Sequence, residues 1–223
     1  HVEGFVDVDS PRVVSDVPAG AFLVASWFAP ATGRIALEPG VTRLTHDGET
    51  VAGVTVSGTR RLSDEGASRE IAGVRLAGAY DLLRALELLL GPDCAEAAGR
   101  AELPPGTIVI GEAERIVSQG AIIEPGVVFD VRNGGVVLET GAEIRSGTRP
   151  EGPCWIGAGA RVVGGFIRGS VIGPRCVVRG EVSSSVFVGY ANKAHDGFVG
   201  HSVIGHWANL GAGTTTSNLK NTY

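Results

Sequence analysis

The chain has 223 residues, of which 43% are hydrophobic and 19% are charged, and it contains 34 glycines. This composition excludes a disordered chain, which would combine few apolar residues with high net charge, and it is typical of an all-β or repeat protein with many tight turns. The formal net charge of −5 at pH 7 provides no basic face for a phosphate backbone, so we expect no nucleic-acid partner.

The cysteines and the chain ends bear on the compartment. Cys94, Cys154 and Cys176 are widely spaced, and an odd number without a close pair argues against a disulfide framework or a cysteine-ligated zinc. We interpret them as small buried side chains. No apolar run is long enough for a membrane span and no signal-peptide pattern is present, which predicts a cytoplasmic protein without a membrane partner. The chain lacks methionine and begins and ends in mid-pattern, so we expect an excerpt of a longer protein.

Residues 1 to about 75 have the pattern of short strands. Val41–Ser57 alternates apolar and polar residues around His46-Asp47-Gly48-Glu49, which predicts a β-hairpin with a turn at Asp-Gly. Asp7 and Asp9 could be metal ligands, but alternation along one strand explains them equally well. No catalytic motif is recognisable in this part of the chain.

The period then changes to that of a helix. Apolar residues recur at helical spacing over Leu76–Gly99, and Gly91-Pro92 is expected to end the helix. The expected apolar stripe consists of Leu76, Tyr80, Leu83, Leu86 and Leu90. Leu103-Pro104-Pro105-Gly106 then predicts a boundary, so we divide the chain into residues 1–104 and 105–223.

Beyond this boundary the apolar residues recur every six positions. The predicted inward positions are Val117, Ile123, Phe129, Leu138, Ile144, Pro150, Ile156, Val162, Ile172, Val178, Ser184, Tyr190, Phe198, Ile204, Leu210 and Thr216. A period of six fits neither an α-helix nor an ordinary strand. It suits a coil of three short faces, about eighteen residues per turn, whose stacked turns bury an aliphatic column.

The predicted fold is therefore mainly β. It is a left-handed parallel β-helix of hexapeptide repeats, preceded by a partial α/β segment, and a β-sandwich with chance spacing is the alternative. Narrow prisms of this kind commonly close into cyclic trimers, so a homotrimer is expected.

The predicted repeat loses its register between Tyr190 and Phe198, where the step is eight residues. Lys193 and His195 lie in between, and binding residues often lie in surface loops on a rigid scaffold. An imidazole, largely neutral at pH 7, can act as a general base, and a lysine can bind phosphate. A solvated turn explains the same residues equally well, so the local pattern leaves both interpretations open.

The segment Phe187–Tyr223 also carries a series of specific motifs. They are Asn192-Lys193-Ala194-His195, His201-Ser202-Val203-Ile204-Gly205, Asn209-Leu210-Gly211-Ala212-Gly213-Thr214 and Ser217-Asn218. From Ile172 onward the chain resembles the acetyltransferase half of bifunctional N-acetylglucosamine-1-phosphate uridylyltransferases, and more closely their sugar nucleotidyltransferase relatives with a hexapeptide-repeat β-helix. The resemblance implies that residues 1–104 are the tail of a nucleotidyltransferase-like α/β domain. Residues 105–223 would be a left-handed β-helix acyltransferase domain, truncated at its end.

The resemblance further implies an N-acetyltransferase that transfers acetyl from acetyl-CoA to an amino-sugar 1-phosphate. Such a protein would make nucleotide sugars as cell-wall precursors, and it would be bifunctional if its upstream domain is an active sugar nucleotidyltransferase. Mg²⁺ is expected only if that domain exists, and the coenzyme A contacts would lie beyond Tyr223. No metal ion is expected in the acetyltransferase site.

Residue roles follow from the same resemblance. Arg179 matches an arginine that holds the sugar phosphate, and Lys193 is a substitute for a second phosphate cation. His195 matches the base that removes a proton from the attacking amine. Asn209 matches a sugar-binding asparagine, and Asn218 one close to the acetyl group.

Two positions depart from the family pattern. Phe198, expected beside the substrate, and Leu219 stand where the family usually has tyrosines. The missing hydroxyls bear on the identity of the sugar or on the activity itself.

Two other functions remain open. His195, His201 and His206 fall within twelve residues, and the step from His201 to His206 is similar to a His-x4-His pair of γ-class carbonic anhydrases. Those enzymes are also left-handed β-helices, and histidines from their adjacent subunits hold zinc. Three imidazoles with an open water position make a sound hydrolytic or hydratase site. The third possibility is a non-catalytic β-helix scaffold that keeps the pocket as a relic.

Overall fold

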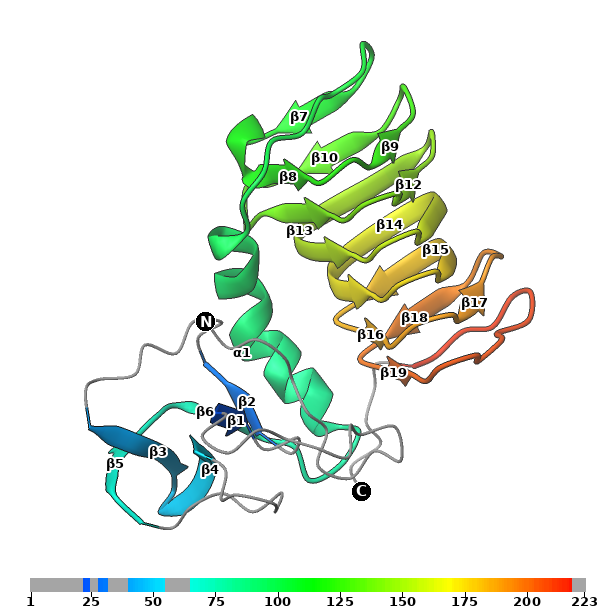
Figure 1. The fold of residues 1–223 in the computed structure, drawn as a ribbon. Coiled ribbons are helices and arrows are strands. Elements are labelled where there is room, and N and C mark those ends of the chain that lie inside the picture. Colours follow the sequence, from blue (N-terminus) through cyan, green and yellow to red (C-terminus); the bar gives the residue numbers. More distant parts are fainter. Residues whose placement is uncertain (1–21, 25–27, 32–39, 55–64, 218–223) are drawn as a thin grey trace. The chain divides into compact units, whose positions relative to one another are not determined.

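The computed structural model describes residues 22–24, 28–31, 40–54 and 65–217. The chain forms two compact units, residues 1–81 and residues 82–223. Figure 1 shows strands in the first unit and a ladder of stacked coils in the second. Asp7 and Asp9, which were considered as metal ligands, lie outside the described residues.

The first unit contains short strands around a small core. The strands are β1 (Phe22–Val24), β2 (Phe28–Pro30), β3 (Val41–His46), β4 (Glu49–Val54), β5 (Ala67–Glu70) and β6 (Gly73–Arg75). Strands β1, β4, β3 and β5 form one sheet in that order, and β2 pairs with β6. The buried core consists of Phe28, Leu44, Val51 and Ala52.

The predicted hairpin is present in this unit. Strands β3 and β4 are antiparallel, with His46 opposite Glu49. The connecting residues Asp47 and Gly48 both have positive φ, 49° and 78°. A two-residue turn with this geometry matches the right-handed twist of the flanking strands, which is why Asp-Gly is favoured there.

The predicted helix is α1 (Asp81–Glu96), with bounds that differ from the expectation. It begins later, because the Asp81 carboxylate accepts hydrogen bonds from the Ala77 and Gly78 N–H groups and closes the preceding turn. The expected end at Gly91-Pro92 is wrong, since Pro92 lies inside the helix. Pro92 removes one backbone hydrogen bond, but buried side chains on both sides of it, Leu90 and Cys94, hold the last turn in place.

The rest of the second unit is a parallel β-helix with three faces. The chain passes from one face to the next, and the longer strands extend over more than one face. The strands are β7 (Ile108–Ile110), β8 (Ile116–Ser118), β9 (Ile122–Ile123), β10 (Val128–Asp130), β11 (Val136–Leu138), β12 (Glu143–Ile144), β13 (Thr148–Ile156), β14 (Arg161–Ile172), β15 (Val177–Ser183), β16 (Val186–Phe187), β17 (Asn192–Lys193), β18 (Phe198–Gly200) and β19 (Val203–Ile204), with a 3₁₀ turn η1 (Ala113–Arg115). Its solenoid makes about six turns over residues 108–204, as expected for a left-handed hexapeptide β-helix. The fold prediction is confirmed.

Strand pairing defines the three faces. The first face contains β7, β10, β18 and parts of β13, β14 and β15; the second contains β8, β11, β16, β19 and the ends of β13 and β14. The third contains β9, β12, β17 and the starts of β14 and β15. We call the turns between the first and second faces the first corner, those between the second and third faces the second corner, and those between the third and first faces the third corner.

Helix α1 packs on the second face of the β-helix. Its buried side chains contact the outward residues of successive coils, namely Val117, Val137, Trp155, Val171 and Val186.

The three cysteines are buried free thiols, as predicted. Burial raises the pKa of Cys94 to about 11. Among the described residues, no helix combines the length and apolarity that crossing a bilayer requires.

The inward column is continuous, but its spacing is not a strict six. Its buried members in the later coils are Val162, Ile167, Ile172, Val178, Val182, Phe187, Lys193 and Val199. The steps between them are four, five or six residues, because the corners differ in length. The predicted six-residue register is therefore wrong at four positions: Val117 faces α1, Ser184 and Tyr190 are corner residues with φ of 47° and 55°, and Phe198 faces outward.

The predicted break between Tyr190 and Phe198 is also absent. Phe187, Lys193 and Val199 are each six residues apart and all point inward. The coil that carries His195 therefore has regular register. What distinguishes it is a lysine at an inward position that is aliphatic in earlier coils.

Candidate active site

A pocket of about 520 Å³ lies at the third corner, beside the last coils. It is lined by Arg179, Ala194, His195, Asp196, Gly197, Ala212, Gly213 and Thr215. Three consecutive coils supply these residues, so the stacking of the β-helix brings together segments at least fifteen residues apart in the sequence. Arg179 and His195, both predicted as site residues, share this pocket.

Asp196 is the acidic group of the pocket. Its Oδ1 accepts a hydrogen bond from Arg179 Nε at 3.0 Å, and Arg179 Nη1 also donates to the Val163 carbonyl at 3.3 Å. These contacts hold the guanidinium at the pocket while about half of its side chain stays exposed. The sequence interpretation named the loop but gave Asp196 no role, and its place directly after His195 was the available signal.

Glycine is required where the next coil meets this corner. Gly197 has φ of 130°, and a Cβ there would lie 2.3 Å from the Thr214 carbonyl oxygen. Nearby, Gly213 N donates to the Asp196 carbonyl at 3.2 Å. Close approach of these two backbones therefore shapes the pocket floor and excludes any larger residue at position 197.

Lys193 lies beneath the pocket, inside the β-helix. It is 1% exposed, and its Nζ donates to the carbonyls of Arg179 at 2.9 Å and His195 at 2.8 Å. Burial lowers the pKa of Lys193, and the nearby Asp196 charge opposes this effect. Lys193 does not line the pocket, so the predicted direct contact with a phosphate does not fit this placement.

The other predicted residues lie elsewhere or outside the description. Asn209 is exposed on the third face, where its Oδ1 accepts a hydrogen bond from Asn192 Nδ2 at 2.7 Å. Phe198 is half-buried on the outward side of the first face, in register with Glu181. Asn218 and Leu219 lie outside the described residues.

Part of the chain is similar to known proteins. No model of a protein family matches the chain. A protein named bifunctional protein GlmU from Jannaschia sp. (strain CCS1) is 38% identical over 107 residues, 46% of this chain and 22% of the relative. About half of the chain is similar to bifunctional GlmU proteins.

Two further relatives carry the same name. GlmU of Anaplasma marginale (strain Florida) is 38% identical over 107 residues, 46% of this chain and 24% of the relative. GlmU of Sphingopyxis alaskensis is 36% identical over 129 residues, 56% of this chain and 27% of the relative. The chain thus spans about a quarter of the length of the GlmU proteins it matches, and the family resemblance inferred from the motifs is confirmed.

The three histidines of the second unit do not converge. His195 lies at the third corner, His201 follows β18 at the first corner, and His206 follows β19 at the second. Within the described residues of the β-helix, no three ligating side chains lie close enough to hold a metal. One chain therefore does not assemble the three-histidine zinc site considered from the sequence.

The first unit does bring three possible ligands together. His46, Asp47 and Glu70 each offer an atom within 4.8 Å of the others. The Glu70 oxygens already accept hydrogen bonds from Thr45 Oγ1 and Asp47 N, both at 2.7 Å. These hydrogen bonds lower the pKa of Glu70, and the bond from Thr45 is the largest cause. The cluster is therefore explained by side-chain hydrogen bonds that stabilise the turn.

Proposed function

We propose that the chain is an acetyl-CoA-dependent N-acetyltransferase that acts on an amino-sugar 1-phosphate. The observation that carries this proposal is the pocket shared by Arg179 and His195, in a chain of which about half is similar to bifunctional GlmU proteins. That similarity supports the broader class of sugar-phosphate acetyltransferases and uridylyltransferases. The pocket adds a cation and a potential base in one place.

His195 is the proposed general base. A sugar ammonium group is no nucleophile, so it must lose a proton before or during attack on the thioester carbonyl. This first proton passes to solvent and leaves a neutral amine. The imidazole takes a second proton from the nitrogen as the new C–N bond forms, and the tetrahedral intermediate then breaks its C–S bond. Coenzyme A leaves as the thiolate and receives the proton from the imidazolium, so that N-acetyl sugar phosphate and coenzyme A are the products.

Arg179 is the proposed phosphate ligand. Its Nε is occupied by Asp196, and its exposed guanidinium is directed into the pocket edge, where it can contact an anionic oxygen. We assign Asn209 to the sugar and Asn218 to the acetyl group from the resemblance alone. Phe198 is proposed to contact the substrate only if another subunit approaches the first face.

A homotrimer is part of the proposal. The outward side of the β-helix exposes large apolar side chains, including Ile108 (55% exposed), Ile122 (59%) and Phe166 (52%). Contact between copies would cover such side chains, and cyclic closure is the ordinary arrangement for homo-oligomers. Light scattering coupled to gel filtration measures the mass directly, and a monomer at micromolar concentration would contradict this part.

The deciding experiment measures free thiol released from acetyl-CoA in the presence of a panel of amino-sugar 1-phosphates. Release that requires the amino sugar should fall by about 10²- to 10⁴-fold in His195→Ala, because a positioned base contributes on that scale. His206→Ala, which removes an imidazole at another corner, is the matched control. No amino-sugar-dependent release from the folded protein would reject the acetyltransferase and favour a scaffold.

A further inference from the structure

The buried ammonium of Lys193 touches the backbone of both principal site residues. Lys193 pairs in register with Val178, so it occupies an inward position of the third face. Its Nζ bonds to the carbonyl oxygens of Arg179 and His195, at 2.9 Å and 2.8 Å. Both carbonyls therefore point into the β-helix at the corner where their side chains face the pocket.

This orientation determines where the neighbouring N–H points. The peptide bond between His195 and Asp196 is trans, and in a planar trans peptide the C=O and N–H bonds point in opposite directions. Because the His195 carbonyl is directed inward to Nζ, the Asp196 N–H is directed outward. Asp196 lines the pocket, and its N–H has no hydrogen-bond partner within the described part of the chain.

The ammonium also strengthens this donor. A positive charge in a low-dielectric interior polarises the carbonyl that it contacts, and the polarisation extends along the peptide to its N–H. Two carbonyl acceptors and the nearby Asp196 charge favour the ammonium form, whereas burial lowers the pKa of Lys193. The pocket thus contains an outward N–H backed by a fixed positive charge.

We propose that the His195–Asp196 peptide is an anion-binding group of the pocket, with the Asp196 N–H as donor and Lys193 as the positioning residue behind it. The ligand is an anionic oxygen. In the proposed reaction it belongs either to the phosphate of the acceptor or to the oxyanion of the tetrahedral intermediate, and this part of the inference rests on the proposed function. Donors fixed before the reaction stabilise such charge without reorganisation.

The first test is independent of any activity. Inorganic phosphate is titrated into the ¹⁵N-labelled protein while the Asp196 amide resonance is followed by NMR. A saturating downfield shift at Asp196 is expected. In Lys193→Met the apparent dissociation constant should rise about tenfold or more, the scale of one hydrogen bond to a charged group.

Leu210→Met is the matched control, because Leu210 packs against the same apolar core in the following coil. This exchange conserves volume and should leave the phosphate titration unchanged. If Lys193→Met does not fold, Lys193→Gln replaces it as the test variant, because it keeps an N–H donor but removes the charge. The phosphate titration of the wild-type protein tests the Asp196 donor without any variant.

Steady-state kinetics then separate the two sources of the anion. A rise in KM for the amino-sugar phosphate in Lys193→Met, with kcat little changed, assigns the donor to the phosphate. A fall in kcat at constant KM, with no phosphate-induced shift, assigns it to the oxyanion. If the protein shows no acetyl transfer but Asp196 shifts with phosphate, the proposed function fails while the anion site stands. An Asp196 amide that does not respond to phosphate overturns the inference if Lys193→Met has wild-type kinetics or if the wild-type protein itself shows no acetyl transfer.

Discussion

The inward column of the third face has aliphatic side chains in its earlier coils and a charged side chain in a later coil. Along the third face, Ile144, Val162 and Val178 are fully buried aliphatic side chains stacked in register. The next coil places Lys193 in this column, equally buried but charged. The earlier coils gain stability from apolar burial, whereas the later coil accepts the cost of burying an ammonium.

The backbone at the third corner differs in the same way. In the earlier coil the Val163 carbonyl is reached by the exposed guanidinium of Arg179. In the later coils the carbonyls of Arg179 and His195 turn inward to Lys193. An inward carbonyl requires a buried donor, so lysine at this column position permits a corner conformation that an aliphatic residue would leave unsatisfied.

The largest effect is expected in the apolar column itself. Phe187 is fully buried, and Phe187→Ala should lower the free energy of unfolding by about 3–5 kcal/mol through lost burial and a residual cavity. Phe166, 52% exposed on the first face, is the matched control. Phe166→Ala should change stability by about 0.5 kcal/mol or less in the monomer. Urea unfolding measures both, and equal losses would contradict the assignment of inward and outward positions.

The second effect contrasts two arginines of the third corner. Arg179→Gln should raise KM for the amino-sugar phosphate about 10- to 100-fold, the scale of losing a charged hydrogen bond, with a smaller change in kcat. Arg145, at the same corner in an earlier coil and paired with Glu143 at 3.3 Å, serves as the control. Arg145→Gln should leave KM unchanged. A similar rise in both variants would mean that general positive charge, rather than the pocket, attracts the substrate.

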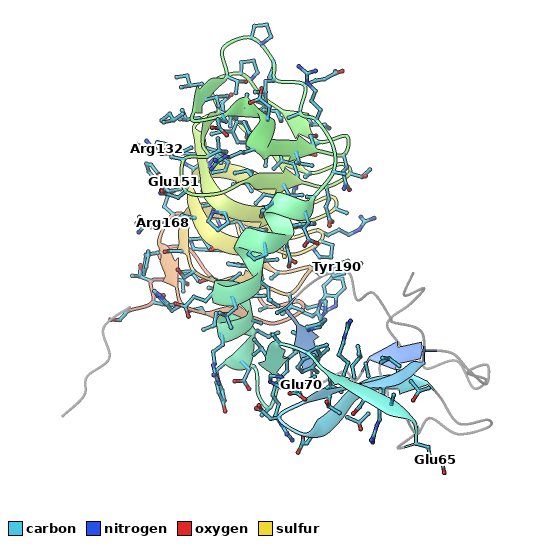
Figure 2. The ribbon with its side chains drawn as sticks, turned by 90° about the vertical axis from the view of Figure 1, so that its left-hand side faces the viewer. Glu65, Glu70, Arg132, Glu151, Arg168 and Tyr190 are labelled. Atoms are coloured by element: carbon cyan, nitrogen blue, oxygen red, sulfur yellow. The ribbon has the colours of Figure 1, made fainter. Side chains whose placement is uncertain are left out.

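The third effect concerns a charged group on the first face. Asp130 accepts hydrogen bonds from Arg132 at 2.6 and 2.9 Å and from Arg149 at 2.8 Å. Figure 2 shows Arg132 on the same side of the β-helix as Glu151 and Arg168. The hydrogen bond from Arg132 is the main reason that the pKa of Asp130 lies well below its usual range, against burial that would raise it.

A lowered pKa in the folded state fixes the sign of the pH effect. The stabilisation is complete above the ordinary aspartate value of about 4 and is lost as pH falls below it toward the folded value. Asp130→Asn should therefore be less stable than wild type at pH 7, and the difference should shrink on acidification. Glu143→Gln, which removes an exposed ion pair, should change stability by about 0.5 kcal/mol or less. Urea midpoints between pH 2 and pH 7 provide the measurement, and a pH-independent difference would contradict the assignment.

Aliphatic periodicity was sufficient to predict the β-helix, because residues such as Ile144, Ile156 and Val178 do point inward. It failed where corners shorten, since a step of four or five residues shifts the inward position to Val182 or Phe187 without any change in composition. A strict count of six residues also placed Lys193 in a surface loop. The strand register pairs Lys193 with the inward Val178, and this position is buried. The common location of Arg179 and His195 was predictable from family motifs, whereas the inward carbonyls depend on backbone geometry that no side-chain pattern encodes.

The smallest expected effect concerns the second corner, where equivalent positions use different residues. Gly141 and Gly159 have φ of 69° and 63°, and Arg175, Tyr190 and Trp207 adopt 55°, 55° and 61° in later coils. The left-handed conformation costs a non-glycine residue about 1–2 kcal/mol. Gly141→Ala should therefore lose about 1 kcal/mol, and the loss is conformational because an added Cβ would approach no atom closer than 4.0 Å.

The reverse exchange, Arg175→Gly, should gain at most about 1 kcal/mol, because the more flexible unfolded chain offsets part of the relieved strain. Trp207→Gly should gain less, since the indole stacks on Tyr190 at 4.7 Å between ring centroids and such pairs contribute about 0.5–1.5 kcal/mol. Urea unfolding of the three variants gives the order directly. If Arg175→Gly is less stable than wild type, the arginine side chain makes a stabilising contact that outweighs its backbone strain, and the later coils then differ from the earlier ones in packing at this corner as well as in charge at the third.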